Sequence, residues 1–111
     1  MAAGTYNFVL DQGATFTRQL TVKDDGTVMN LTGYSVASKM RSTHDSSTVV
    51  GTFTCTISDA SAGQITMQMT NSTTAAIEEG IYVYDLEITA SSGTVTRIME
   101  GNITVNPEVT R

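Results

Sequence analysis

The sequence predicts an all-β domain: an antiparallel β-sandwich of about seven strands with one short helical turn. Threonine is abundant and proline occurs once, a composition that favours half-buried pleated strands over helices. Apolar and polar residues alternate with a period of two along most of the chain. Signals for tight turns separate the alternating segments, which is typical of antiparallel neighbours.

Seven alternating segments use nearly the whole length of the chain. Two turns between them contain the glycines that tight hairpins require, Asp24-Asp25-Gly26 and Ser91-Ser92-Gly93. The predicted strands are Thr5–Leu10, Thr15–Lys23, Tyr34–Arg41, Thr48–Ser58, Gln64–Met69, Ile81–Thr89 and Thr94–Val105.

The side chains of every second strand residue share a face, so parity predicts the core. The opposite faces carry mainly threonine and glutamine, which indicates two antiparallel sheets, each wet on its outer side. One core is expected to contain Phe16, Leu20, Val36, Phe53, Ile57, Ile65, Met67, Tyr84, Leu86 and Ile88.

One helical turn is expected between the strands Gln64–Met69 and Ile81–Thr89. Asn71 or Ser72 is predicted to cap it, and Gly80 to end it in the left-handed conformation. Tyr82 then either returns its hydroxyl to the backbone of the preceding turn, as in a tyrosine corner, or packs in the core with its hydroxyl at the rim.

The last strand interrupts its own alternation at Ile98. Gly101 in the same strand predicts either a β-bulge or a close approach of a neighbouring backbone. The terminal segments Met1–Tyr6 and Pro107–Arg111 are expected to be ordered by contacts with other subunits, because nothing inside the chain requires them.

Length and charge limit the classes of function. At 111 residues the chain is expected to be one domain, 1–111. A net charge of −5 with six basic residues argues against nucleic acid or an anionic membrane as partner. No apolar run approaches the roughly 20 residues that span a bilayer, and no signal peptide is recognisable, so a soluble protein made in the cytoplasm is expected.

Two residues that often carry chemistry occur once each. Cys55 excludes an internal disulfide and is expected to be a buried small hydrophobe, since a nucleophile or sensor thiol would need a basic neighbour. His44 is expected to be solvated in a polar loop, because a metal or catalytic role would require Asp45 plus distant partners.

The acidic clusters also favour structural explanations. Asp24-Asp25-Gly26 lacks the later ligands of a calcium loop and is predicted to be a turn. Glu78-Glu79 is expected to face water or a basic partner surface. Asp85 and Glu87 lie two apart on an outward face and are expected to be solvated. Without a phosphate loop, nucleophile elbow or metal cluster in the sequence, no enzyme activity, catalytic residue, cofactor or metal site is expected.

Several segments occur in an order that is similar to a known class of proteins. They are the corner Gln12-Gly13-Ala14-Thr15-Phe16 after a short aromatic strand, then Asn30-Leu31-Thr32-Gly33-Tyr34, Tyr82–Glu87, Thr96–Gly101 and Val105–Thr110. In this order they resemble small virion proteins of tailed bacteriophages. More loosely, they resemble the immunoglobulin-like N-terminal domain of phage baseplate upper proteins. The resemblance covers nearly the full chain except Ser42–Ala62.

The resemblance implies an immunoglobulin-like sandwich and a non-enzymatic virion structural protein. Such a protein would be an adaptor or accessory subunit of the tail, baseplate or fibre attachment region, made in the host cytoplasm. Its partners would be other virion proteins in a symmetric assembly of many copies, or a homo-oligomer, without nucleic acid or membrane. Two alternatives remain open: a capsid decoration (cement) protein of the head, and a host-surface carbohydrate- or receptor-binding module.

Overall fold

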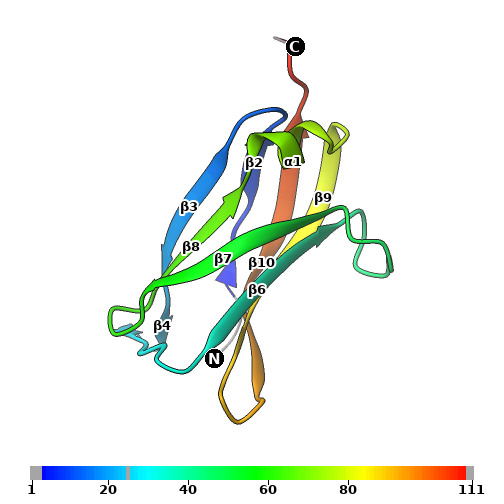
Figure 1. Ribbon diagram of the computed structural model, residues 1–111. Coiled ribbons are helices and arrows are strands. Elements are labelled where there is room, and N and C mark those ends of the chain that lie inside the picture. The colour runs from blue at the N-terminus through cyan, green and yellow to red at the C-terminus, as the bar shows by residue number, and fades with distance from the viewer. Residues whose placement is uncertain (1–3, 25, 110–111) are drawn as a thin grey trace.

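The structure is a computed structural model that describes residues 4–24 and 26–109 (Figure 1). It confirms an all-β chain with one short helix. In chain order the elements are β1 (Gly4–Thr5), β2 (Phe8–Asp11), β3 (Phe16–Thr21), β4 (Lys23–Asp24), β5 (Thr27–Val28), β6 (Ser35–Arg41), β7 (Gly51–Asp59), β8 (Gln64–Met69), α1 (Asn71–Ala75), β9 (Gly80–Thr89) and β10 (Val95–Asn106).

Eight of the strands form one curled sheet, a half-barrel. Its order is β1-β10-β9-β6-β7-β8-β3, with β2 also paired to β10, while β4 and β5 form a separate ribbon. Strand β7 joins the two halves, because its first residues pair with β6 and its later residues with β8. The half-barrel therefore differs from the two separate sheets that alternation suggests.

The sheet is also mixed and not purely antiparallel. Both N-terminal strands run parallel to β10, with Gly4 opposite Met99 and Phe8 opposite Ile103. The single strand expected over Thr5–Leu10 is thus two short strands in one register along β10. Side-chain alternation looks the same for either strand direction, so it carried no signal for this parallel pairing.

Both predicted hairpin turns are present. Gly26 (φ 80°) lies in the turn of the β4–β5 ribbon, and Gly93 (φ 96°) in the turn between β9 and β10. In the second turn Ala90 N donates to Thr94 O at 2.9 Å. Asp25 of the first turn lies outside the described residues.

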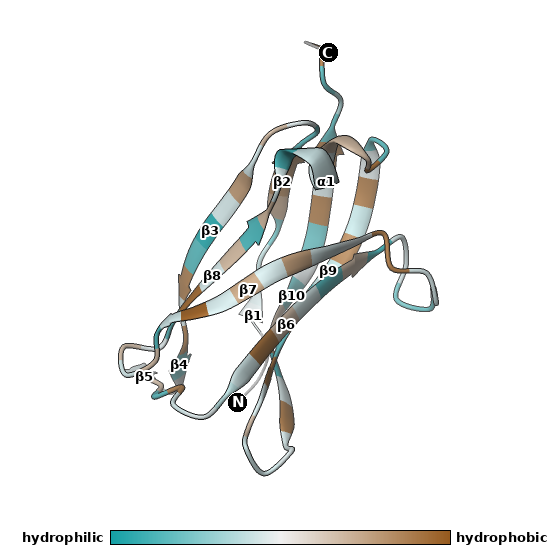
Figure 2. Cartoon of the chain, viewed as in Figure 1, coloured by the Kyte–Doolittle hydropathy of each residue, from teal (hydrophilic) through white to brown (hydrophobic). Residues whose placement is uncertain are grey.

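The core follows the predicted parity but is divided into two clusters. Bands of hydrophobic and hydrophilic residues alternate along the long strands in Figure 2. Val36 and Ile98 pack against both clusters and join them. Of the ten expected core residues, Leu20, Val36 and Ile57 are only partly buried, and the buried ones are Phe16, Phe53, Ile65, Met67, Tyr84, Leu86 and Ile88.

The larger cluster is built around four aromatic rings. Phe8 lies 5.6 Å from Phe16 and 5.1 Å from Tyr84 between ring centroids, and Phe53 lies 5.6 Å from Phe16. The smaller cluster, which includes Ile65 and Ile88 of the predicted set, lies around Val22 and Leu31. A single core was therefore the wrong expectation.

Gly101 allows the close approach of a second backbone. A Cβ atom at this position would overlap the carbonyl group of Tyr6. On either side of this contact, Tyr6 N donates to Glu100 O at 2.8 Å and Asn102 N donates to Asn7 Oδ1 at 3.0 Å. Of the two expectations for Gly101, close approach is confirmed.

The bulge lies three residues earlier. The register between β9 and β10 shifts between Arg97 and Met99, which leaves Ile98 as the extra residue. A bulge changes the face toward which the next residues point. This explains why Ile98 interrupts the alternation of the last strand.

The helix starts and ends earlier than predicted. Thr70 is its N-cap, with a side-chain oxygen that accepts from Thr73 N at 3.4 Å, so neither Asn71 nor Ser72 has that role. The helix ends at Ala75, and its C-cap Ala76 has a right-handed conformation. Gly80 begins β9 and does not terminate the helix. Threonine is one of the residues preferred as an N-cap, and β8 ends directly before Thr70.

The corner between β2 and β3 is cross-linked to the helix and to the end of β10. Gln12 Nε2 donates to Ile77 O at 2.8 Å, and Gln12 Oε1 accepts from Glu108 N at 3.0 Å. The buried Thr74 hydroxyl accepts from Gly13 N at 3.1 Å and donates to Ala14 O at 2.8 Å. One end of the half-barrel is thereby closed by side-chain hydrogen bonds.

The described parts of both terminal segments are ordered by their own domain. Gly4 and Thr5 pair with β10, Tyr6 accepts a hydrogen bond at 2.6 Å from the Tyr84 hydroxyl, and Glu108 is held by Gln12. This differs from the expectation that other subunits order these segments. Residues 1–3 and 110–111 lie outside the described ranges.

Replacing Thr74 with valine should destabilise the protein by about 1–3 kcal/mol, because it leaves the Gly13 amide and the Ala14 carbonyl without their buried partner. Urea unfolding measures the difference. Thr54→Val on the exposed face of β7 is the control and should change stability by less than about 0.5 kcal/mol. Equal stability of the two variants would contradict the role given to Thr74.

Gly101→Ala should destabilise the protein by about 1–3 kcal/mol or more, since the added methyl group meets the Tyr6 backbone and not a flexible side chain. Hydrogen exchange should show lost protection in β1 and β2. The matched control is Gly4→Ala on the paired strand β1, where the nearest described atom to the new Cβ is the Ile98 carbonyl oxygen at 3.9 Å. Retained protection of β2 in Gly101→Ala would contradict the proposed contact.

Candidate functional site

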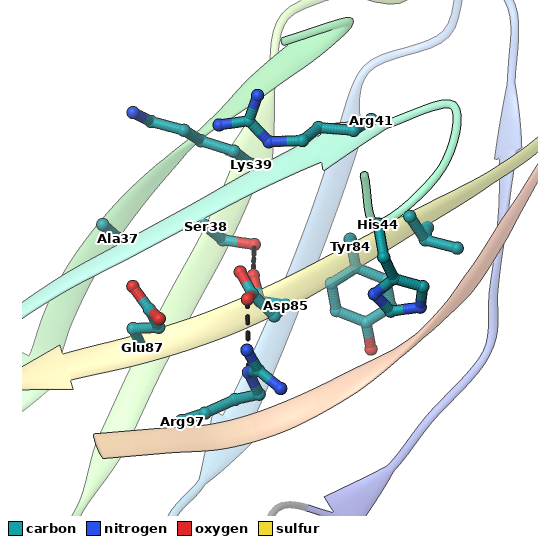
Figure 3. A pocket seen from close by; sticks show the side chains of 10 residues that line it. Ala37, Ser38, Lys39, Arg41, His44, Tyr84, Asp85, Glu87 and Arg97 are labelled. Carbon is teal, nitrogen blue, oxygen red and sulfur yellow. Dashed lines mark hydrogen bonds and ion pairs between the residues drawn. The ribbon is translucent and has the colours of Figure 1, made fainter. Parts of the chain in front are cut away.

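A polar hollow lies on the outer face of β6, β9 and β10 (Figure 3). Its volume is about 340 Å³. Odd-numbered residues of β6 and β9 point outward, so the register brings Lys39 beside Asp85 and Ala37 beside Glu87. The loop after β6 contributes His44. The lining residues are Ala37, Ser38, Lys39, Arg41, His44, Val83, Tyr84, Asp85, Glu87 and Arg97.

Hydrogen bonds and ion pairs fix the walls of the hollow. Arg97 Nε lies 3.3 Å from Asp85 Oδ2, and Arg97 Nη1 lies 3.5 Å from Glu100 Oε2. Arg41 Nη1 donates to Ser46 O at 3.2 Å and so holds the loop after β6. Because Arg97 is about half exposed, its ion pairs contribute at most about 1 kcal/mol each. They position side chains more than they stabilise the fold.

The structure places Asp85, Glu87 and His44 around the same hollow. The sequence indicated that Asp85 and Glu87 share an outward face but did not connect them with His44. The link is the pairing of β6 with β9, which alternation alone does not reveal. Within 4–24 and 26–109, no group of three or more His, Cys, Asp or Glu side chains could hold a metal ion. The chemistry available here is hydrogen bonding and ion pairing with a polar ligand.

Cys55 is half-buried on β7 against the larger cluster. Burial raises the pKa of its thiol to about 11, and the thiol donates a weak hydrogen bond to Phe53 O at 3.8 Å. A neutral thiol without a basic neighbour is a poor nucleophile. The side chain packs as the small hydrophobe that the sequence predicted.

The first of the two expectations for Tyr82 is confirmed. Its hydroxyl donates to Glu78 O at 2.7 Å, which returns it to the backbone of the turn before β9. Glu78 and Glu79 are exposed and border a shallow polar hollow with Gln12 and Pro107.

The Tyr84 hydroxyl has a structural role, because it donates a hydrogen bond to the Tyr6 carbonyl. Burial raises the pKa of this hydroxyl.

Sequence reasoning missed Arg18. It stands between Phe16 and Leu20 on the inward-facing positions of β3, and its guanidinium lies 5.2 Å from the centroid of the Phe8 ring and 5.9 Å from that of Phe16. The same parity that selected Phe16 and Leu20 would have flagged a charged residue between them. Cations over aromatic rings contribute about 0.5–1 kcal/mol at exposed sites.

Comparisons with known proteins give a structural similarity only. No protein-family model matches the chain, and a search of curated proteins finds no match. An internalin-like protein of Listeria monocytogenes is structurally similar, with a TM-score of 0.48 and 15% identity. The match covers 94% of this chain and 28% of that protein, so the chain spans just over a quarter of its length. No helix in the described part is long and apolar enough to span a membrane.

The raised pKa of Cys55 predicts slow alkylation. Below pH 9 the native thiolate fraction should be about 100-fold smaller than in the unfolded chain, because the pKa rises from 9.0 to about 11. The rate with iodoacetamide should therefore increase about tenfold per pH unit up to about pH 11 in the native protein, and level off near pH 9 in urea. A native rate equal to the unfolded rate at pH 8 would contradict the burial of this thiol.

Proposed function

We propose that the chain is a non-enzymatic structural subunit of a tailed-bacteriophage virion, an adaptor or accessory protein of the tail, baseplate or fibre attachment region. The proposal rests on the resemblance and on one observation in the structure. Two of the segments that resemble phage virion proteins, the corner at Gln12 and the end of the chain at Asn106–Glu108, are hydrogen-bonded to each other. They form one unit at one end of the domain.

This unit presents an exposed apolar residue. Glu108 is anchored by Gln12, and the next residue, Val109, is 90% exposed. In Figure 1 the chain leaves the body of the domain at this point. An anchored chain end with an exposed apolar side chain suits a contact with a neighbouring subunit. In an assembly of many copies, small contacts add up through effective concentration.

The finer fold proposed with this function is immunoglobulin-like. The bond from the Tyr82 hydroxyl to the Glu78 carbonyl has the geometry of a tyrosine corner, in which a tyrosine at the start of a strand bonds backbone a few residues upstream. On this view the half-barrel is a sandwich whose halves share β7.

A host-surface carbohydrate- or receptor-binding module is the second candidate. It is favoured by the polar hollow, which is lined by the donors Lys39 and Arg41 and the acceptors Asp85 and Glu87. His44, which also lines this hollow, lies within Ser42–Ala62, the stretch that the phage resemblance does not cover. Capsid decoration remains the alternative within the virion class and would use the same chain-end contact.

The protein content of purified particles tests the proposal. Virions of a phage that encodes this chain should contain it, and its copy number relative to the major capsid protein, measured by quantitative mass spectrometry, separates the locations. A few copies per tail support the tail or baseplate, and hundreds per particle support decoration of the head. A protein that is expressed in infected cells yet missing from virions would overturn the proposal. Glycan and whole-cell binding by the isolated domain would favour the receptor-binding module.

Val109→Glu should reduce incorporation into particles several-fold without lowering the melting temperature by more than a few degrees, because the side chain is 90% exposed. Val95→Glu is the matched control, since this valine is 55% exposed at the start of β10, the strand that precedes the terminal segment. It should be incorporated normally. Equal incorporation of both variants would remove Val109 from the contact.

A further inference from the structure

The curled sheet leaves an open seam. We use "the seam" for the gap between β3, at one end of the sheet, and β1 and β2, which both pair with β10 at the other end. Strand β3 pairs with β8 alone. Across the described residues, no backbone hydrogen bond joins β3 to β1 or β2. Unpaired strand edges of this kind are templates for the addition of another strand.

An apolar groove lies at one end of the seam. Its volume is about 310 Å³. The bulge at Ile98 matters here, because Ile98 and the adjacent Met99 both line this groove, although neighbours in a regular strand face opposite ways. The lining residues are Gly4, Leu20, Thr21, Val22, Lys23, Leu86, Ile98 and Met99.

The space beside Gly4 keeps the groove open. Among residues 4–24 and 26–109, the non-neighbouring heavy atom within 4 Å of a Cβ built at Gly4 is the Ile98 carbonyl oxygen, at 3.9 Å. Farther along the seam toward Phe16, the Arg18 guanidinium lies over the Phe8 ring and covers the aromatic cluster. The seam is thus covered at Arg18 and accessible at Leu20.

Charge indicates what kind of segment fits. The chain carries a net charge of −5, yet the charged side chain that lines the groove, Lys23, and the one that covers the aromatic cluster, Arg18, are both cations. Asp11, at the end of β2, accepts a hydrogen bond from Asn106 Nδ2. Among the side chains that the structure describes, which do not include those of Asp24 and Asp25, none forms an ion pair with Arg18 or Lys23. An acidic segment would therefore meet two cations at the edge of a protein whose net charge is negative.

We propose that the seam binds an extended acidic and apolar segment of another virion subunit, which adds to β3 as a further strand. Alternate residues of an added strand face inward. An aliphatic residue would enter the groove beside Leu20, and an acidic residue two positions away would meet Arg18. The inference rests on the proposed function, because it names the partner segment that such an adaptor would hold.

A pair of peptide probes tests the chemistry of the seam. Each is a ten-residue peptide of alternating threonine and valine, with one central valine replaced by aspartate in the first and by lysine in the second. The aspartate peptide should bind the full chain at least tenfold more tightly in fluorescence anisotropy. Arg18→Glu should reverse the preference. Thr17→Glu, which adds the same charge to the outward face of β3, should keep it. Absence of binding, or equal binding of both peptides, overturns the proposal.

Measurements on purified virions distinguish a failure of this inference from a failure of the proposed function. Hydrogen exchange of residues 16–21 should be slower in virions than in the isolated protein, and Arg18→Glu should be incorporated several-fold less than Thr17→Glu. If the wild-type chain is absent from virions, the proposed function fails. If it is present, but β3 is unprotected and Arg18→Glu is incorporated normally, only the seam inference fails. If hydrogen-exchange protection of β3 in the pure protein increased with protein concentration, the occupant of the seam would be a second copy of this chain. That result would also overturn the inference.

Discussion

The close contact between the Tyr6 carbonyl and Gly101 is the constraint on which the rest of the structure depends. Because residue 101 has no side chain, the N-terminal segment can run along β10 in one register on both sides of this point. That register turns Phe8 inward to begin the aromatic cluster. The Tyr6 carbonyl then accepts a hydrogen bond from the Tyr84 hydroxyl, so the close contact also satisfies a polar group.

The same pairing decides where the sheet stays open. Because β1 and β2 both pair with β10, neither of them pairs with β3. The two halves of the sheet are joined through β7, which pairs with β6 and with β8. The hydrogen bonds of Gln12 and Thr74 hold the two halves together at one end. Elsewhere the smaller hydrophobic cluster does so, because it contains Ile65 of β8 and Ile88 of β9.

Alternation predicted what depends on side-chain parity and little that depends on strand partners. It placed Gln64–Met69 at the bounds observed for β8 and turned Leu86 and Ile88 into the core. The pattern indicated irregularities at Ile98 and Gly101 but did not indicate which of the two was the bulge. Parallel pairing left no trace in the pattern. The polar hollow also depends on the register of Lys39 with Asp85, which only the folded sheet reveals.

The parallel pair of β2 and β10 has a mechanical consequence. In Figure 1 the chain enters β1 near one end of the domain and leaves β10 at the other. A force that pulls these two ends apart would slide β2 along β10 and would load their hydrogen bonds together, not one after another as in unzipping. Forced unfolding is governed by the unfolding rate and not by equilibrium stability. The domain would therefore resist extension along its length more strongly than its small core suggests.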